Sequence, residues 1–371
     1  MRTIYCKSTA FFISALVAIS ITVDVALANW FLLPGIYYSD DYGLVGSIAF
    51  INENADKERV SLGFSYFGEG QGQGDFLIFL PENHSEWTFN LLYQAYDLDA
   101  YSVYESFQQE VLTTDTRYWV DLWMRCDFPR DGGIFYGFET AYRSSQFKYG
   151  SLDSRYNGYP SPITSIFTDA EEYVFSLRAG LERRDDRYNS FRGTYFLWQI
   201  DIGRSDTGFD NHQLIRTQAD FRKYIPLSKR NSAIAFNLRG GVIHHQVPYL
   251  SQFKMGGSLS LRGFPLNRYY GNGYYLLRTE FRNDVIHDLP SPLSRFFQAE
   301  EGVDNTFSLG FALFTEIGDL WRPDLGWWGL RQGVGVGLRA VFPPSVVATI
   351  DIATPVDSDH ITIYLNIGQS F

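Results

Sequence analysis

Two features common in exported and membrane proteins are scarce in this sequence: cysteines and long apolar runs. Only Cys6 and Cys126 are cysteines among the 371 residues. After residue 28 no segment approaches the roughly 18 consecutive apolar residues of a membrane-spanning helix. If the N-terminal segment that holds Cys6 is removed on export, one thiol remains and cannot pair within the chain. Disulfide scaffolds and helical membrane bundles are thereby excluded.

Basic residues are also in deficit, with 31 Lys and Arg against 42 Asp and Glu and a formal net charge of -11. No dense Lys/Arg cluster reverses this balance locally, so nucleic acid is not an expected partner. The sequence contains no GxSxG motif of a serine hydrolase. The adjacent His244 and His245 would point to opposite faces of a strand, which disfavours a shared metal. We therefore expect a protein that is not an enzyme, with no catalytic residues, no metal and no cofactor.

The first 28 residues have the pattern of a secretory signal peptide. Arg2 and Lys7 precede or flank the start of the apolar run STAFFISALVAISITV, and the small residues ALA end at Ala28. A basic start, an apolar middle and a small-residue cleavage site predict export, with cleavage after Ala28. Cys6 lies before the apolar run, on the wrong side of it for a lipoprotein anchor. The mature domain is expected to span residues 29–371.

From about residue 41 onward, apolar and polar residues alternate with a period of two, and helical periodicity is nearly absent. In TYFLWQIDIG, for example, Phe196, Trp198 and Ile202 share one face, while Gln199 and Asp201 share the other. The apolar face is bulky and aromatic in segment after segment, and arginines and carboxylates occupy the opposite face. A water-soluble β-sandwich also alternates, but its inner faces form one dry core. An apolar band toward lipid around a polar lumen fits the pattern better.

About fifteen such segments, most of roughly ten residues or more, can be counted along the chain. Single-chain bacterial barrels close with an even number of strands. The sequence therefore predicts an all-β fold, a transmembrane antiparallel β-barrel of sixteen strands, located in the outer membrane and in contact with its lipids.

The sequence ends in the amphipathic segment HITIYLNIGQSF. Five residues share its apolar face: Ile361, Ile363, Leu365, Ile367 and Phe371. In a closed barrel the last strand supplies the hydrogen bonds that leave no unpaired strand edge in lipid. A final strand of this kind, ending on an aromatic residue, is also what barrel-insertion machinery recognises. We expect these residues to form the terminal insertion strand.

The segment of about residues 247–272 is long for a hairpin connection, and loops of that length are usually functional or ordered by something else. It contains SLRGF, in which Arg262 precedes the Gly263–Phe264 pair. Gly256 and Gly257 lie just before this motif and, like Gly263, allow tight turns and close approach to a wall. The sequence predicts a re-entrant loop inside the lumen.

Two strands after the loop offer acidic partners for Arg262. The alternation in GYYLLRTEFRND places Glu280 on the polar face, and the alternation in TFSLGFALFTEIGDLW places Glu316 there. A loop folded into the lumen would let both carboxylates receive the planar guanidinium. Leaving such a buried charge without a partner costs about 3–5 kcal/mol, so the pairing would fix register more than add net stability. An arginine exposed on the loop surface is the alternative.

Several segments occur in an order that resembles the BamA/TamA outer-membrane assembly-factor superfamily, also called bacterial surface antigens. They are SLRGF (260–264), FTEIGDLW (314–321), GVGVGLRAVFPPSVVATIDIATPV (333–356) and LPGIYYSDDYGLVGSIAF (33–50). Glu316 stands where that family more usually has an aspartate, a conservative change. The resemblance is strong over roughly residues 256–371 and weaker, but collinear, before them.

The resemblance implies a sixteen-stranded barrel with the loop tucked inside, which inserts or translocates unfolded polypeptide clients at the outer membrane. In some members this occurs through a weak seam between the first and last strands. Family members usually carry periplasmic POTRA domains that receive clients. None is evident in this sequence, which points to a separate periplasmic partner. The alternatives are a passive pore whose lumen charges select solutes and, less favoured, an outer-membrane hydrolase.

Overall fold

The protein is described by a computed structural model. The described residues are 30–39, 43–53, 59–68, 71–81, 85–104, 107–127, 133–149, 169–187, 189–227, 232–290, 306–323, 326–327, 329–342, 346–358 and 360–367. The predicted signal peptide, residues 1–28, and its cleavage site lie outside this set. Within the set, no helix has the length and apolar character needed to cross a membrane.

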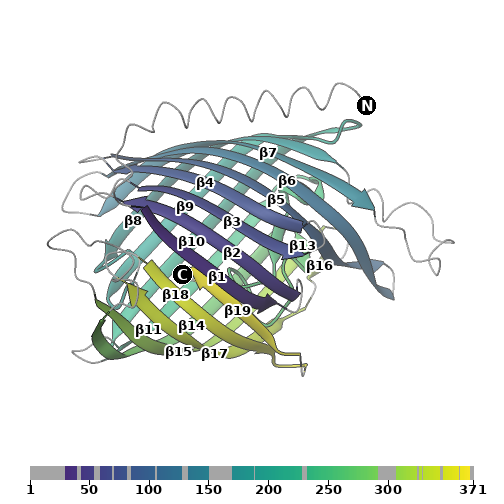
Figure 1. Cartoon of the computed structure of the whole chain (residues 1–371). Coiled ribbons are helices and arrows are strands. Elements are labelled where there is room, and N and C mark those ends of the chain that lie inside the picture. The colour runs from purple at the N-terminus through teal and green to yellow at the C-terminus, as the bar shows by residue number, and fades with distance from the viewer. Residues whose placement is uncertain are drawn as a thin grey trace.

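Antiparallel β-strands make up most of the described chain (Figure 1). The strands are β1 (Trp30–Ser39), β2 (Gly43–Glu53), β3 (Arg59–Gly68), β4 (Gln71–Pro81), β5 (Ser85–Tyr104), β6 (Phe107–Asp127), β7 (Ile134–Tyr149), β8 (Ala170–Arg184), β9 (Gly193–Asp206), β10 (Asn211–Pro226), β11 (Ser232–Ile243), β12 (Phe253–Met255), β13 (Tyr269–Gly271), β14 (Gly273–Pro290), β15 (Thr306–Arg322), β16 (Gly326–Trp327), β17 (Arg331–Phe342), β18 (Val346–Pro355) and β19 (Thr362–Ile367). A short 3₁₀ turn, η3 (Tyr249–Ser251), lies between β11 and β12.

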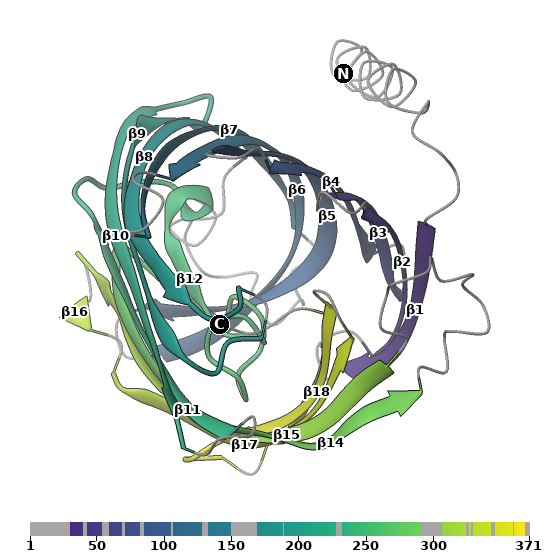
Figure 2. The ribbon, with the colours of Figure 1, turned by 90° about the vertical axis from the view of Figure 1, so that its left-hand side faces the viewer.

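Each long strand pairs with the next long strand along the chain, from β1 through β11 to β14, β15, β17, β18 and β19. The two-residue β16 pairs with the end of β15, and β12 and β13 form a small sheet of their own. The sheet curls until β1 and β19 lie side by side (Figure 1). Figure 2 shows the ring that the strands enclose. The predicted antiparallel barrel is confirmed.

The number of strands that close the barrel stays a prediction. Among the described residues, no hydrogen-bonded ladder joins β1 to β19, although every other pair of long neighbours is joined by one. We call the junction where β1 and β19 lie side by side the seam.

Exposure alternates along the strands as the sequence pattern predicts. In β8, Phe175 and Leu177 are 47% and 51% exposed, whereas Ser176 between them is 1% exposed. In β9, Trp198 is exposed and Asp201 is fully buried. A water-soluble sandwich would bury the apolar face instead. Because the apolar face points outward and the charged face inward, the wall has a lipid side and a polar lumen.

Candidate functional site

The connection between β11 and β14, residues 244–272, folds back into the space enclosed by the strands. Figure 2 shows β12 and the neighbouring coil inside the ring. Along this loop Tyr249, Met255, Leu261 and Arg262 are each 1% exposed or less. With these residues buried, the loop fills part of the lumen and forms contacts with its wall.

Arg262 lies at the centre of these contacts. Its Nε donates to Oε1 of Glu316 at 2.7 Å, and its Nη2 donates to Oε2 of Glu280 at 3.1 Å. Its Nη1 donates to Oδ2 of Asp351 in β18 at 2.9 Å, and its backbone N–H donates to Oε2 of Glu316 at 2.6 Å. The guanidinium carbon lies 3.4 Å from the ring centre of Phe314. The structure thus brings Arg262, Glu280 and Glu316 together and adds a third carboxylate.

Three further arginines share the same carboxylates. Arg278 lies 3.2 Å from Glu316, Arg282 lies 2.7 Å from Glu280, and Arg339 of β17 lies 3.4 Å from Glu280. All of these side chains are at most 3% exposed. Four arginines and three carboxylates therefore form one buried network, in which each carboxylate has a fixed place.

The charge of Arg262 is secured by its surroundings. Burial lowers the pKa of its guanidinium, but Glu316, Glu280 and Asp351 raise it by more, and the pKa ends above its ordinary value. The side chain is therefore a permanent cation, and its place in the lumen requires the carboxylates around it.

The SLRGF segment is a closed lobe. The N–H of Gly257 donates to the carbonyl of Phe264 at 2.9 Å. The hydroxyl of Ser260 accepts from the N–H of Gly256 at 2.8 Å and donates to the carbonyl of Gly256 at 2.7 Å. An apolar cluster forms beneath the lobe, made of Met255, Leu261, Phe264, Tyr269, Leu276 and Leu320. The lobe presents Arg262 to the wall as a preformed unit.

Two glycines let the lobe touch the wall backbone to backbone. Gly263 has φ of +94°, and a Cβ there would lie 2.8 Å from the carbonyl carbon of Thr354 in β18. A Cβ at Gly333 of β17 would collide with the carbonyl oxygen of Arg262. Glycine is required at Gly263 by both conformation and space, and at Gly333 by space. The glycine-rich stretch that begins at Gly333 thus has a packing role.

The lobe also bonds to the last strand. The N–H of Gly263 donates to the hydroxyl of Tyr364 in β19 at 3.0 Å, and that hydroxyl donates to the carbonyl of Phe264 at 3.1 Å. Ile363, predicted on the apolar face, is 38% exposed, whereas Tyr364 is 8% exposed. The side chains of Leu365 and Ile367, and the whole of Phe371, lie outside the described residues. The loop tip is therefore connected directly to a strand at the seam.

The base of the loop lies against a different part of the wall. Arg216 of β10 donates to Asp201 of β9 at 2.5 Å and to the carbonyl of Ser251 at 3.2 Å. Apolar packing completes this contact, in a cluster made of Ala141, Val174, Leu214, Ile243 and Val247. The loop consequently spans the lumen from the wall of β7–β10 to the wall of β14–β19.

A second segment enters the lumen at the turn between β8 and β9, residues 185–192. Arg339 donates to Oδ1 of Asn189 at 2.7 Å, and Nδ2 of Asn189 donates to Asp284 of β14 at 3.5 Å. Ser190 is fully buried. Because β9 and β17 are five steps apart along the ladder, this turn reaches across the lumen to the network around Arg262.

Comparison with known proteins places this architecture in a family. The sequence profile of the Omp85 superfamily domain matches residues 35–270, more than half of the chain. The chain belongs to the Omp85 superfamily. The family predicted from the motifs, an outer-membrane β-barrel of the BamA/TamA type, is thereby confirmed. The matched part of this Omp85 chain includes Arg262 and ends before Glu280 and Glu316.

Solved structures show the same fold. BamA from Haemophilus ducreyi lacking POTRA domains 1–3 is similar with a TM-score of 0.55 and 15% identity, over 92% of this chain and 70% of that one. CdiB from Acinetobacter baumannii and CdiB from Escherichia coli give TM-scores of 0.56 and 0.57, each at 15% identity over 92% of this chain. The chain spans 59% and 63% of these two CdiB structures. No curated protein sequence matches it.

Asp351, Tyr364 and Asn189 are among the residues of the Omp85 site that the sequence analysis did not single out. Asp351 occupies a polar position of an alternating strand, so its place on the lumen face could have been read from VVATIDIATP. Tyr364 alternates with the apolar Ile363 and Leu365 in the last strand, but nothing in the sequence links it to the loop. Asn189 lies in a turn without periodicity, where no sequence signal indicates an inward path.

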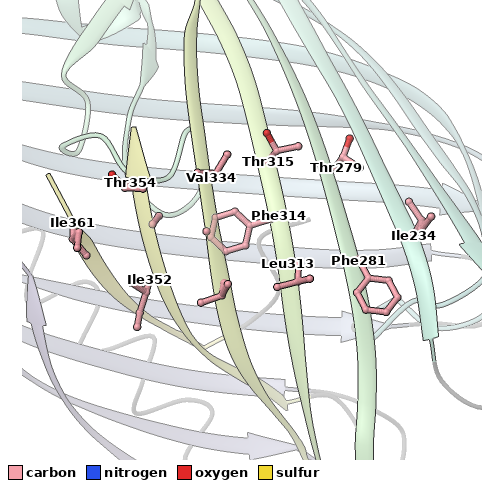
Figure 3. Close-up of a pocket in the computed structure, with 13 residues that line it drawn as sticks. Ile234, Thr279, Phe281, Leu313, Phe314, Thr315, Val334, Ile352, Thr354 and Ile361 are labelled. Carbon is pink, nitrogen blue, oxygen red and sulfur yellow. The ribbon is translucent and has the colours of Figure 1, made fainter. Parts of the chain in front are cut away.

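The outer face of the wall carries a different kind of feature. A shallow hollow of about 590 Å³ extends over β11, β14, β15, β17 and β18 (Figure 3). Leu313, Val336 and Ile352, which line it, are between 44% and 50% exposed. Apart from three threonines its lining is apolar or glycine. This surface suits contact with acyl chains, and the charged groups of the site lie on the other side of the wall.

Proposed function

We propose that this Omp85 protein inserts or translocates polypeptides at the outer membrane, with residues 244–272 occupying the lumen and the β1–β19 seam acting as a gate. Membership of the superfamily supports the polypeptide-handling role. The observation that carries the gate is the pair of hydrogen bonds between the loop tip and Tyr364, because they connect the lumen segment to a strand at the seam.

The pairing of β19 agrees with this role. Among the described residues, which end at Ile367, its ladder with β18 joins six residue pairs, from Ala348–Ile367 to Ala353–Thr362. On its other side, β19 has no ladder with β1 among the described residues. The bonds from the loop to Tyr364, and from Arg262 to Asp351 of β18, add to the contacts that hold β19 in the wall. Withdrawal of the loop tip would therefore loosen the strand that a client must displace.

Covalent locking of the seam tests the proposal. A cysteine at Ile363 would be paired in turn with cysteines placed along β1, with Cys126 replaced by serine. The control is a lock within the wall, Thr279→Cys with Thr315→Cys, which are direct partners in the β14–β15 ladder. The readout is the folding of a urea-unfolded outer-membrane barrel polypeptide added to liposomes that contain the protein, followed by heat-modifiability.

We expect the seam lock to abolish acceleration of folding and reduction of the disulfide to restore it, while the wall lock has no effect. Equal activity with and without the seam lock would contradict the gate. A protein that never accelerates folding, or never releases a translocated chain in a matched export assay, would contradict the function itself.

A passive solute pore is the competing function. Its lumen would be open, whereas here Arg262 and Asn189 belong to two segments that cross it. We expect low, flickering conductance in planar bilayers; a steady, large current from the native protein would favour the pore. The role is proposed to be non-enzymatic, because the lumen network consists of paired arginines and carboxylates. Lipid turnover by the purified protein would contradict that part.

A further inference from the structure

The hairpin of β5 and β6 is much longer than the wall it belongs to. The two strands have 20 and 21 residues. β4 pairs with β5 only from Glu86 to Ala95, and β7 pairs with β6 only from Thr113 onward. Beyond those points the two strands pair with each other, up to the Tyr104–Phe107 pair (Figure 1). A two-stranded ribbon therefore projects past its neighbours.

Among the described residues, the outer edge of β5 has no paired strand along this ribbon. The neighbouring hairpin turns between Gly68 of β3 and Gln71 of β4, and Gly72 pairs with Ala95. The two-residue connection between β3 and β4 is too short to extend alongside the next nine residues of β5, Tyr96–Tyr104. At about 3.3 Å per residue this edge is roughly 30 Å long, longer than a strand of about 5–6 residues. In the described part of the chain, no strand pairs with it on that side.

The ribbon projects from the rim at which the loop enters. Neighbouring strands run in opposite directions, and β5 and β11 occupy the fifth and eleventh places in the ladder, so they run in the same direction. β11 ends where residues 244–272 begin. β1 starts and β19 ends at the opposite rim. Three strands, β2, β3 and β4, lie between β5 and β1, so the open edge is separated from the β1–β19 seam.

An open edge of this length is a template for another strand, because its backbone N–H and C=O groups are directed outward in a regular row. Soluble and membrane proteins commonly block such edges with lysine or proline. Residues 96–112 contain neither. They include the aromatic residues Tyr96, Tyr101, Tyr104 and Phe107, a residue type enriched at protein interfaces.

The charge of the ribbon restricts what can add to it. Residues 96–112 contain four acidic residues, Asp97, Asp99, Glu105 and Glu110, and no Lys or Arg. Two copies of this edge would place carboxylates next to carboxylates, and like charges on neighbouring strands are destabilising. A strand with alternating basic residues would place opposite charges there. Self-pairing is disfavoured, and a basic segment is favoured.

We propose that the free edge of β5 at Tyr96–Tyr104 binds an extended, basic segment of a partner polypeptide by strand addition. Backbone hydrogen bonds supply the affinity, and the ribbon's acidic residues select lysine and arginine at alternate positions. This interaction is independent of the gate at the seam and would persist in a protein whose seam is locked.

The test uses the full-length protein in nanodiscs and a fluorescent peptide of alternating lysine and valine. The first comparison is with the same peptide N-methylated at alternate residues, which removes hydrogen-bond donors along one edge and keeps the charge. The second is with an alternating glutamate and valine peptide. Fluorescence anisotropy measures each affinity at physiological ionic strength.

We expect the lysine peptide to bind at least about tenfold more tightly than either comparison peptide, a difference of about 1.4 kcal/mol. Asp97→Lys with Asp99→Lys should lower the affinity for the lysine peptide about tenfold and raise that for the glutamate peptide. The matched control is Asp210→Lys, because Asp210 is an exposed acid in the β9–β10 turn at the same rim. It should change neither affinity.

Four results would overturn the proposal. They are absence of binding to the native protein, equal binding of the N-methylated peptide, unchanged binding by the doubly substituted protein, and dimerisation of the native protein that Asp99→Lys abolishes. Heat-modifiability of each variant shows that the barrel has assembled, so a loss of binding cannot be attributed to a loss of folding.

Discussion

The two ends of the lumen loop are fixed to the wall by different kinds of contact. At the tip, Arg262 donates to three carboxylates on three strands, and every partner is buried. At the base, Val247 packs among apolar side chains, and Arg216 adds one bond to the carbonyl of Ser251. Apolar packing tolerates small shifts, whereas a planar guanidinium between fixed acceptors accepts one position. The tip therefore specifies where the loop lies, and the base holds it in the lumen.

The comparison predicts its largest effect for Arg262→Glu. A carboxylate there would face Glu280, Glu316 and Asp351, and each buried charge left without a partner costs about 3–5 kcal/mol. Such a loss is comparable with the whole stability of a domain, about 5–15 kcal/mol. We expect little assembled barrel, measured as heat-modifiable protein in the outer-membrane fraction. Arg192→Glu, at an exposed arginine, should assemble normally; native amounts of the Arg262 variant would contradict the role of the tip.

A charge exchange at one partner should not rescue this variant. Adding Glu316→Arg to Arg262→Glu pairs the two changed residues, but it leaves Glu280 and Asp351 facing the new carboxylate. It also places the new arginine 3.2 Å or so from the position of Arg278, as the native pair spacing indicates. Full recovery of assembly in the double variant would show that Glu316 alone positions the loop.

A smaller effect is expected for Gly333→Ala on the wall side of the tip. The added methyl group would collide with the carbonyl of Arg262, and overpacking of this kind costs about 1–3 kcal/mol. Denaturant unfolding in detergent micelles should show that loss. At Gly74, by contrast, the nearest atom to a new Cβ is 3.7 Å away in Phe64. Gly74→Ala is the control, and equal unfolding curves for both variants would refute the close contact.

Tyr364→Phe should cost about 1–2 kcal/mol, because the N–H of Gly263 and the carbonyl of Phe264 lose their partner in a buried place. Its diagnostic effect is local: amide hydrogen exchange should accelerate in β19 and stay unchanged in β14. Tyr275→Phe, on the outer face at 37% exposure, is the matched control. Unchanged amide hydrogen exchange in β19 would contradict the proposed connection between the loop tip and the seam.

The smallest effect on the position of the loop is expected at the base, for Val247→Ala. Val247 is 6% exposed, and removal of its two methyl groups costs about 1–2 kcal/mol. Because the tip is intact, the loop should remain in the lumen and the conductance should stay low. A stability loss equal to that of Arg262→Glu, or a large open current, would reverse the assignment of roles to tip and base.

The sequence predicted the parts of this structure that depend on periodicity. Alternation placed Trp198 outward and Glu280 and Glu316 inward, and the SLRGF motif indicated a loop that returns to them. The sequence did not predict how many carboxylates bond to Arg262. Asp351 is 89 residues away along the chain, and only the order of the strands in the barrel brings it to the site. The inward direction of the turn at Asn189 could not be predicted either, because a turn has no alternating pattern that assigns its residues to the lumen or to the outside.

The two segments inside the barrel come from opposite rims. Residues 244–272 descend from the rim where β11 ends, and the turn at Asn189 rises from the rim where β8 ends. Both terminate at the same arginine–carboxylate network, and Arg339 contacts Asn189 as well as Glu280. A polypeptide moving along the barrel axis would have to displace both segments, and each segment is held in place partly by the network that it shares with the other. A polypeptide leaving sideways past β19 would have to displace only the loop of residues 244–272, which is bonded to Tyr364.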